Sequence, residues 1–195
     1  MTRIYFVRHA QPCHEVKDDR SRPLTAEGMK NTLSVTQCLK DKDINVLMSS
    51  PYKRSMDTIK DLSETLQMPI ETDEDFRERN RGSWTCENFK EGISFLWSDI
   101  KNHIVPDDEC ISDVQSRNIA ALNRVLEKYP NKNVVIATHG MALSSMLNYY
   151  DNSFRYDGFM RLVDWMPYII ELDFEGDKLV EKHEHLIIEK EFRKG

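Results

Sequence analysis

Short apolar runs alternate with longer amphipathic stretches along this chain. Residues 4–7 and 134–137 are consecutive apolar positions, with aromatic and β-branched side chains in the first and mainly β-branched ones in the second, and such runs predict buried strands. Smaller runs predict further strands at 46–48 and 69–72. In three other stretches apolar residues recur every three or four positions, which predicts helices over 24–40, 52–66 and 112–129.

The other segments continue this alternation. Residues 88–105 predict a short helical insertion, 141–149 a helix, and 168–188 a pair of strands joined by a turn. The polar, charged residues of 13–23 and 76–84 predict loops. Strands that alternate with helices predict an α/β domain, with a mostly parallel sheet and helices on both of its faces.

The first predicted helix begins after Thr25. This residue is a suitable N-cap, because its hydroxyl can accept a hydrogen bond from a backbone N–H of the first turn. The apolar face of the helix is uneven. The residues expected on it are Leu33 and Leu39, with Met29 and either Val35 or Thr36 between them.

The composition limits the possible partners. A chain of 195 residues with 39% hydrophobic and 31% charged residues fits one folded domain rather than a disordered protein. The net charge of −6 argues against a general nucleic-acid or membrane-surface binder, although a local basic pocket is compatible with it. We find no signal-peptide pattern and no apolar run approaching the roughly 18 residues of a membrane span. The cysteines are widely spaced and predict free thiols and a cytoplasmic protein; they are Cys13, Cys38, Cys86 and Cys110.

Polar residues follow two of the predicted strands directly. Arg8 and His9 come after the first apolar run, and His139 and Gly140 come after the run at 134–137. An isolated Arg-His pair is also explained by a strand that ends at the surface. Because open α/β sheets bind ligands at the carboxyl ends of their strands, the repeated pattern favours a shared ligand site.

Five motifs occur in a fixed order along the chain, at 4–9, 24–28, 49–54, 76–84 and 137–140. With this order and spacing, the chain resembles the histidine phosphatase superfamily in its phosphoglycerate mutase-like branch, from residue 4 to about residue 147. The resemblance implies a three-layer α/β/α sandwich of the phosphoglycerate mutase-like kind. It also implies a single domain over 1–195, with a small helical insertion around 86–110, and a histidine acid phosphatase-like phosphomonoesterase, which is a hydrolase.

The resemblance also implies roles for individual residues. His9 is the expected nucleophile, whose phosphohistidine water then hydrolyses, and Glu78 is the expected general acid. Arg54 stands where the family places a phosphate-binding arginine after its Ser-Ser-Pro turn. The implied catalytic residues are His9, Glu78, His139, Arg8 and Arg54, and the implied substrate-binding residues are Arg8, Gln11, Arg54, His139 and Gly140.

Some positions depart from the family pattern. Ala10 stands where Gly is usual, and Cys86 stands in place of the Gly of a Glu-Gly pair. Arg79 and Arg81 replace residues that are commonly apolar or aromatic. These two arginines indicate either a second anionic group on the substrate or solvent-exposed side chains. In the loop at 13–23, three basic side chains are candidates for phosphate contacts or for simple solvation, namely His14, Arg20 and Arg22.

The leading hypothesis is hydrolysis of a small phosphomonoester with neither a metal nor another cofactor. His183 and His185 share a face of the last predicted strand, and we interpret them as a polar face rather than as a metal site. Two alternatives remain: a phosphoglycerate mutase-type phosphotransferase, and a catalytically weak phosphate-binding regulatory module. The natural substrate and the oligomeric state stay open.

Overall fold

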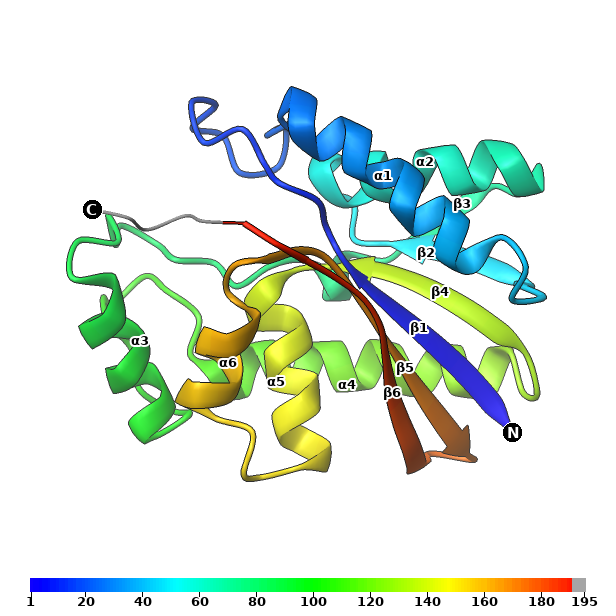
Figure 1. Ribbon diagram of the computed structural model, residues 1–195. Coiled ribbons are helices and arrows are strands. Elements are labelled where there is room, and N and C mark those ends of the chain that lie inside the picture. Colours follow the sequence, from blue (N-terminus) through cyan, green and yellow to red (C-terminus); the bar gives the residue numbers. More distant parts are fainter. Residues whose placement is uncertain (191–195) are drawn as a thin grey trace.

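The computed structural model describes residues 1–190 and has one mixed sheet of six strands (Figure 1). The strand order is β3-β2-β4-β1-β5-β6. The first four strands in this order run parallel, whereas β5 and β6 are antiparallel additions at one edge. The strands are β1 (Thr2–Arg8), β2 (Val46–Ser49), β3 (Ile70–Thr72), β4 (Asn133–Thr138), β5 (Trp165–Glu175) and β6 (Lys178–Glu189).

Helices cover both faces of this sheet, as predicted for a three-layer sandwich. One face carries α1 (Ala26–Leu39) and α2 (Lys53–Leu66) (Figure 1). The opposite face carries the other helices and the one-turn η1 (Glu74–Phe76); they are α3 (Phe89–Ser98), α4 (Ile111–Lys128), α5 (Gly140–Tyr150) and α6 (Tyr156–Leu162).

The core lies on both sides of the sheet because side chains alternate along each strand. In β1, Ile4 and Phe6 belong to the cluster under α4 and α5, while Tyr5 and Val7 belong to the cluster under α1 and α2. All four side chains are at most 1% exposed. A strand buried on both faces reads as a continuous apolar run, which is the pattern that the sequence has at this point.

Helix α1 confirms its predicted cap but only part of its predicted apolar face. Thr25 accepts a hydrogen bond from the Gly28 N–H at 2.9 Å. Met29 and Leu33, expected to be buried, are 47% and 56% exposed. The rest of the predicted face is confirmed, since Leu39, Val35 and Thr36 are buried, and Gly28 and Thr32 complete the buried side. A Cβ on Gly28 would lie 2.4 Å from the Gln11 carbonyl oxygen, so the helix starts against the loop after β1, and this close approach sets which face is covered.

Helices α3 and α6 form a separate layer of the molecule beside α5. Ile93, Leu96 and Trp97 of α3 pack on Phe159 of α6 and Met141 of α5. The predicted insertion helix is therefore present as α3, whereas α6 was not predicted. Its seven residues contain only two buried side chains, which is too little for a periodic pattern to be detected.

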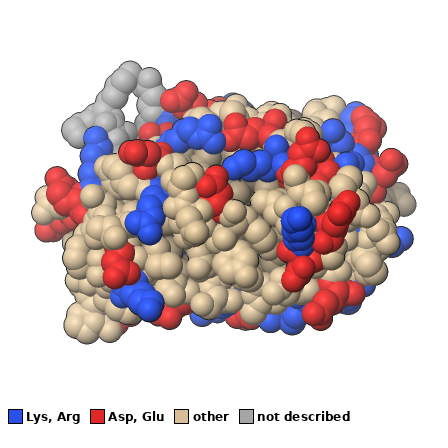
Figure 2. Space-filling model, turned by 90° about the horizontal axis from the view of Figure 1, so that it is seen from below, with Lys and Arg blue, Asp and Glu red and all other residues tan. Residues whose placement is uncertain are grey.

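The surface in Figure 2 carries interspersed acidic and basic side chains rather than a field of one sign. No helix within residues 1–190 combines the length and the apolar character needed to cross a membrane. All four cysteines are free, as predicted.

Candidate active site

The site lies where β1 and β4 end side by side. These strands pair in parallel, with Arg8 opposite Thr138, so the next residue of each strand, His9 and His139, emerges at the same edge. The two imidazole rings lie 5.3 Å apart between centroids, and both side chains are buried. The motifs that end the two strands are thus brought together, although 130 positions separate them in the sequence.

His9 is held in one orientation by hydrogen bonds to both ring nitrogens. Nδ1 lies 2.7 Å from the Ala10 carbonyl oxygen, and Arg54 Nε donates to Nε2 at 3.2 Å. The first contact places the proton on Nδ1 and leaves the lone pair on Nε2. Burial, with the nearby charges of Arg54 and Arg8, holds the pKa of His9 well below its ordinary value of 6.5. His9 is therefore neutral, as a nitrogen nucleophile must be.

Arg8 extends from the end of β1 under the start of α5. Its Nη1 contacts the carbonyl oxygens of Leu162 and Trp165. Burial lowers the pKa of Arg8 to about 10, so it remains a cation at neutral pH. A Cβ at Gly140 would lie 3.1 Å from Arg8 Nη2, so glycine at this position lets the guanidinium pack directly against the helix.

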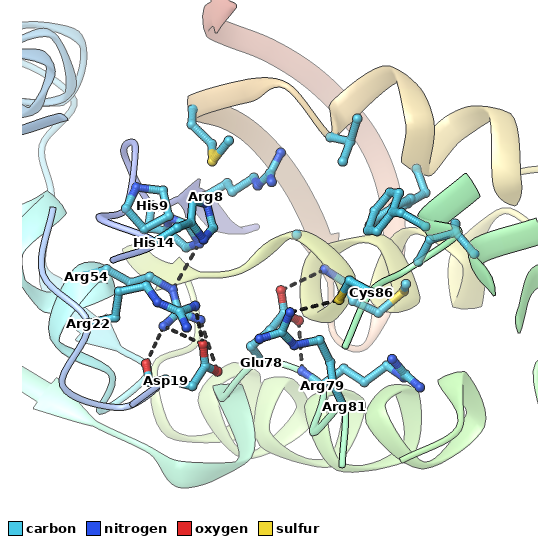
Figure 3. A pocket seen from close by; sticks show the side chains of 18 of the residues that line it. Arg8, His9, His14, Asp19, Arg22, Arg54, Glu78, Arg79, Arg81 and Cys86 are labelled. Atoms are coloured by element: carbon cyan, nitrogen blue, oxygen red, sulfur yellow. Dashed lines mark hydrogen bonds and ion pairs between the residues drawn. The ribbon is translucent and has the colours of Figure 1, made fainter. Parts of the chain in front are cut away.

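Arg54 is a buried cation in the first turn of α2, where the helix dipole disfavours positive charge. Asp19 offsets this cost. Arg54 Nη1 donates to the Asp19 backbone carbonyl at 2.5 Å, and Nη2 lies 3.4 Å from the Asp19 carboxylate. Arg22 Nη1 contacts the same carboxylate at 2.7 Å (Figure 3). One carboxylate of the 13–23 loop thus occupies a position between two cations of the cavity.

His139 is neutral and completely buried. Its Nε2 lies 2.8 Å from Ser50 Oγ and 3.3 Å from Ser55 Oγ. Its Nδ1 has no hydrogen-bond partner within residues 1–190. Burial, followed by the charge of Arg54, keeps the pKa of His139 well below 6.5. When Nε2 accepts from Ser50, Nδ1 carries the proton and is an unused donor.

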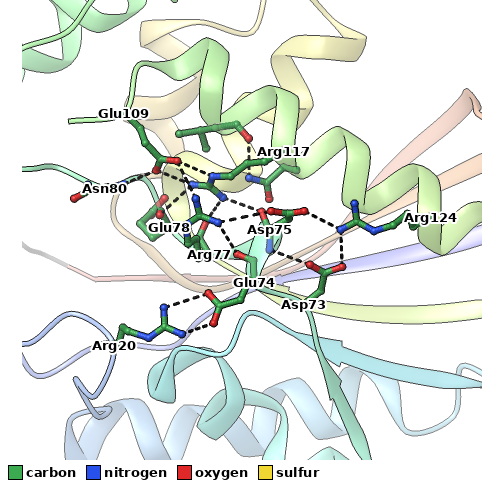
Figure 4. A network of polar contacts seen from close by, with 12 residues as sticks. Arg20, Asp73, Glu74, Asp75, Arg77, Glu78, Asn80, Glu109, Arg117 and Arg124 are labelled. Atoms are coloured by element: carbon green, nitrogen blue, oxygen red, sulfur yellow. Dashed lines mark hydrogen bonds and ion pairs between the residues drawn. The ribbon is translucent and has the colours of Figure 1, made fainter. Parts of the chain in front are cut away.

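Glu78 sits at the amino end of α5. Its carboxylate accepts from the backbone N–H groups of Met141 and Ala142 at 3.1 and 3.0 Å, and from that of Arg79 at 2.8 Å. Helix amino ends attract anions, which accounts for this placement. Arg117 of α4 fixes the backbone beside it, by donating to carbonyl oxygens at 75, 77 and 78 (Figure 4).

Arg117 also binds both carboxylate oxygens of Glu109, each at 2.9 Å. Glu109 in turn accepts from the Asn80 N–H at 2.7 Å. The segments on the two sides of Glu78 are therefore tied to one arginine of α4. Glu109 is thus fully engaged in this network.

A cavity of about 320 Å³ connects these residues (Figure 3). It contains Arg8, His9, Arg54, Glu78 and Gly140, all of which are among the predicted site residues. The opposite wall is largely apolar and comes from the insertion and from the segment around α6; it includes Trp84, Phe89, Ile93, Phe159, Val163 and Met166.

Three predicted contacts do not line the cavity. His139 is fully buried and lies beside His9, with 5.3 Å between the two ring centroids. Gln11 does not line the cavity; its side-chain oxygen accepts from Thr25 Oγ1 at 3.3 Å, at the cap of α1. Arg20 pairs with Glu74 outside the cavity. His14 and Arg22, the other basic candidates of this loop, do line it. No sequence pattern indicated Asp19, because its contact with Arg54 spans 35 positions and starts in an irregular loop.

Possible metal ligands lie outside the cavity. His183 and His185 contact Glu181 and Glu171 respectively, as expected for a polar strand. Within residues 1–190, one further set of donor atoms lies within 4.8 Å of one another, on His103, Cys110 and Asp113. None of these three side chains lines the cavity, so they are not positioned to act on its ligand.

Comparisons with known proteins identify the family of the chain. Residues 4–179 match the histidine phosphatase superfamily (branch 1), and the chain belongs to this family. It is a phosphatase or mutase enzyme of that superfamily. The uncharacterized phosphatase PhoE of Bacillus subtilis is 29% identical over 154 residues, covering 75% of this chain and 76% of PhoE. A probable phosphoglycerate mutase, GpmB of Yersinia pestis, is 25% identical over 160 residues, covering 76% and 74%.

Solved structures share the fold. Bacillus stearothermophilus YhfR superposes with a TM-score of 0.78 at 19% identity, covering 92% of this chain and 95% of YhfR. A mutant phosphoserine phosphatase of Entamoeba histolytica, in complex with phosphoserine, gives a TM-score of 0.77 at 17% identity, covering 92% and 94%. At these identities the likeness defines the fold alone. It confirms the predicted phosphoglycerate mutase-like α/β sandwich.

Proposed function

We propose that this protein hydrolyses a small phosphomonoester through a covalent phosphohistidine on His9 Nε2. The observation that supports this most directly is the state of His9: a buried, neutral imidazole whose Nδ1 is bound by the Ala10 carbonyl and whose Nε2 faces Arg54. A phosphomonoester carries up to two negative charges near neutral pH, and Arg8 and Arg54 supply two fixed cations beside this nitrogen. The complex of a relative of the same fold with phosphoserine supports a small phosphorylated substrate.

In the first step, Nε2 of His9 attacks phosphorus and the bond to the leaving oxygen breaks. Arg54 passes from Nε2 to the phosphoryl oxygens, where its fork and that of Arg8 neutralise the charge that spreads over them. His139 does not line the cavity, but its ring lies 5.3 Å from that of His9, and we propose that its unused Nδ1–H becomes a neutral donor to the phosphoryl group bound to His9. Glu78 gives a proton to the leaving alcohol.

In the second step, Glu78 takes a proton from water, which attacks the phosphohistidine. The N–P bond breaks, inorganic phosphate leaves and neutral His9 is restored. The proposal for Glu78 is supported by the three N–H groups that hold its carboxylate and by the cavity that it shares with His9. Every group in this sequence of steps comes from the chain itself.

The test is hydrolysis of 4-nitrophenyl phosphate by the wild type and by His9→Ala, with and without excess chelator. We expect wild-type turnover that survives the chelator and falls on the order of 10³-fold or more in the variant. His183→Ala, which removes an exposed histidine of β6, is the matched control and retains full activity. Activity that persists in His9→Ala, or that the chelator abolishes, contradicts the mechanism.

A mutase is separated from a hydrolase by following both products. Equal rates of nitrophenol and inorganic phosphate release identify water as the acceptor. Nitrophenol release without phosphate release, with an acid-labile phosphoryl label retained on His9, identifies a phosphotransferase instead.

A further inference from the structure

Most arginines around the cavity already have a carboxylate partner. Arg22 and Arg54 share Asp19, Arg79 is paired with Asp108, and outside the cavity Arg77 is paired with Glu109. Two arginines of the cavity wall differ. Within residues 1–190, neither Arg8 nor Arg81 forms an ion pair with a carboxylate. Arg8 belongs to the proposed phosphoryl site. Arg81 is thus a cation of the cavity wall that, among the described residues, has neither a carboxylate partner nor a place in that site.

Arg81 has only a weak acceptor in the structure. Its Nη1 lies 3.0 Å from Cys86 Sγ, its one side-chain hydrogen bond within the described part of the chain (Figure 3). Sulfur accepts hydrogen bonds poorly, so an anion can replace this contact at little cost. Two carboxylates that line the same cavity are engaged elsewhere: Asp19 by Arg22 and Arg54, and Glu78 by three backbone N–H groups.

The backbone that carries Arg81 is fixed on both sides. Asn80 N–H donates to Glu109 at 2.7 Å, and Ser83 N–H donates to Asp107 at 3.1 Å. Gly82, with a φ of +54°, adopts a left-handed conformation that favours glycine, and a Cβ there would lie 2.6 Å from the Asp107 side chain. The guanidinium is therefore presented from a held loop, which reduces the conformational entropy lost when it binds a ligand.

Arg81 also marks the junction of two hollows. It lines the catalytic cavity and an adjoining depression, which share Asp19 and Arg79 as well. The depression contains Lys17, a second cation without an ion pair among the described residues. The apolar wall with Trp84 and Phe159 lies in the same cavity. A ligand that fills this space has an apolar body and a negative charge at its outer end.

We infer that the substrate is a phosphate ester of an apolar alcohol that bears a second anionic group, and that Arg81 binds this group. The inference rests on the proposed function, because Arg8 and Arg54 hold the phosphoryl group at the other end. Carboxylate and phosphate each accept two parallel hydrogen bonds from the planar fork of a guanidinium. Arg81 is thus a specificity-determining residue, which contributes little when the leaving group is neutral.

The test compares isosteric substrates that differ in one charge. The substrates are 3- and 4-carboxyphenyl phosphate, each beside its neutral carbamoylphenyl counterpart. For the wild type we expect kcat/KM to be about tenfold higher for at least one carboxylate than for its carboxamide, the size of one charge-assisted hydrogen bond. In Arg81→Gln this ratio falls to about one, while kcat/KM for the carboxamide stays within about twofold. Arg81→Lys, which keeps the charge, retains part of the preference.

The control variant is Arg20→Gln. It removes the same charge from the adjoining depression, but from a side chain that is paired with Glu74 and does not line the cavity. We expect its ratio to equal that of the wild type. A substrate with two phosphates, 1,4-phenylene bisphosphate, shows whether phosphate is the preferred second anion. A preference for it that is lost in Arg81→Gln supports the inference equally.

Several results overturn the inference. If the wild type has the same kcat/KM for each carboxamide as for its carboxylate and for the bisphosphate, the second-anion site is refuted while the phosphatase function stands. The same holds if Arg20→Gln lowers the ratio as much as Arg81→Gln, because the effect is then one of net charge. If the wild type hydrolyses none of these esters, the proposed function fails, and the inference fails with it.

Discussion

Asp19 pairs with Arg54, the proposed phosphate-binding arginine, and removal of its carboxylate is expected to tighten anion binding. The perturbation is Asp19→Asn, which removes the carboxylate charge but leaves the backbone carbonyl that holds Arg54 Nη1 at 2.5 Å. The position of Arg54 is thereby preserved. In this variant an incoming phosphate does not have to displace the Asp19 carboxylate from Arg54, and it is not repelled by that negative charge.

The magnitude follows from the exposure of the pair. The Asp19 side chain is 33% exposed and that of Arg54 is 4% exposed, so solvent screens their interaction only in part. Partly exposed ion pairs of this kind contribute up to about 1 kcal/mol. Lost competition of that size corresponds to a factor of about five in a dissociation constant. We therefore expect Asp19→Asn to lower both the KM for an aryl phosphate and the Ki for inorganic phosphate about fivefold, without raising kcat.

The assay is inhibition of 4-nitrophenyl phosphate hydrolysis by inorganic phosphate. Asp18→Asn provides the control, since it makes the same charge change one position earlier, where the carboxylate contacts Ser21 instead of an arginine. An unchanged Ki in Asp19→Asn refutes the reasoning. An equal decrease in both variants also refutes it, because that result shows a general charge effect and no competition at Arg54.

Three further predictions concern packing, protonation and positioning. Gly140→Ala places a methyl group 3.1 Å from Arg8 Nη2, and displacement of this held guanidinium is expected to lower kcat/KM about tenfold or more, measured on an aryl phosphate. His9 and His139 have pKa values below 6.5 in the folded chain, chiefly through burial, so the unfolded chain binds more protons below that pH. The free energy of unfolding should then fall as the pH drops below about 6.5, by up to about 1.4 kcal/mol per pH unit for each histidine. Urea titrations at several pH values test this. If the free energy of unfolding of His139→Gln depends on pH as steeply as that of the wild type, the prediction is contradicted. Arg117→Lys keeps the positive charge but loses the forked guanidinium that reaches three carbonyl oxygens around Glu78. We expect kcat to fall about tenfold with little change in KM. A change in KM alone would argue against a role of Arg117 in positioning Glu78.

The sequence predicted the elements whose pattern is local. Strand β4 (Asn133–Thr138) contains the predicted apolar run at 134–137, and Thr25 caps α1, because an apolar run and a capping hydroxyl depend on neighbouring residues alone. The proximity of His9 and His139 could also be predicted, since neighbouring parallel strands end at the same edge of a sheet.

Other features depend on tertiary contacts that no local pattern carries. The buried face of α1 is set by its close approach to the Gln11 carbonyl, which leaves Met29 and Leu33 in solvent. The pairing of Asp19 with Arg54 and the reach of Arg117 to three carbonyl oxygens join distant segments. The roles assigned to the site residues remain predictions that the experiments above test.

The division of the cavity between separate elements has a consequence for redesign. The proposed phosphoryl site is carried by the ends of β1 and β4 and the first turns of α2 and α5, whereas the apolar wall comes from α3, α6 and the segments beside them. Chimeras can therefore exchange residues 84–105 with those of a relative, whereas α6 is kept because the Leu162 carbonyl accepts a hydrogen bond from Arg8. Such exchanges offer a direct route from one leaving-group preference to another on an unchanged reaction centre.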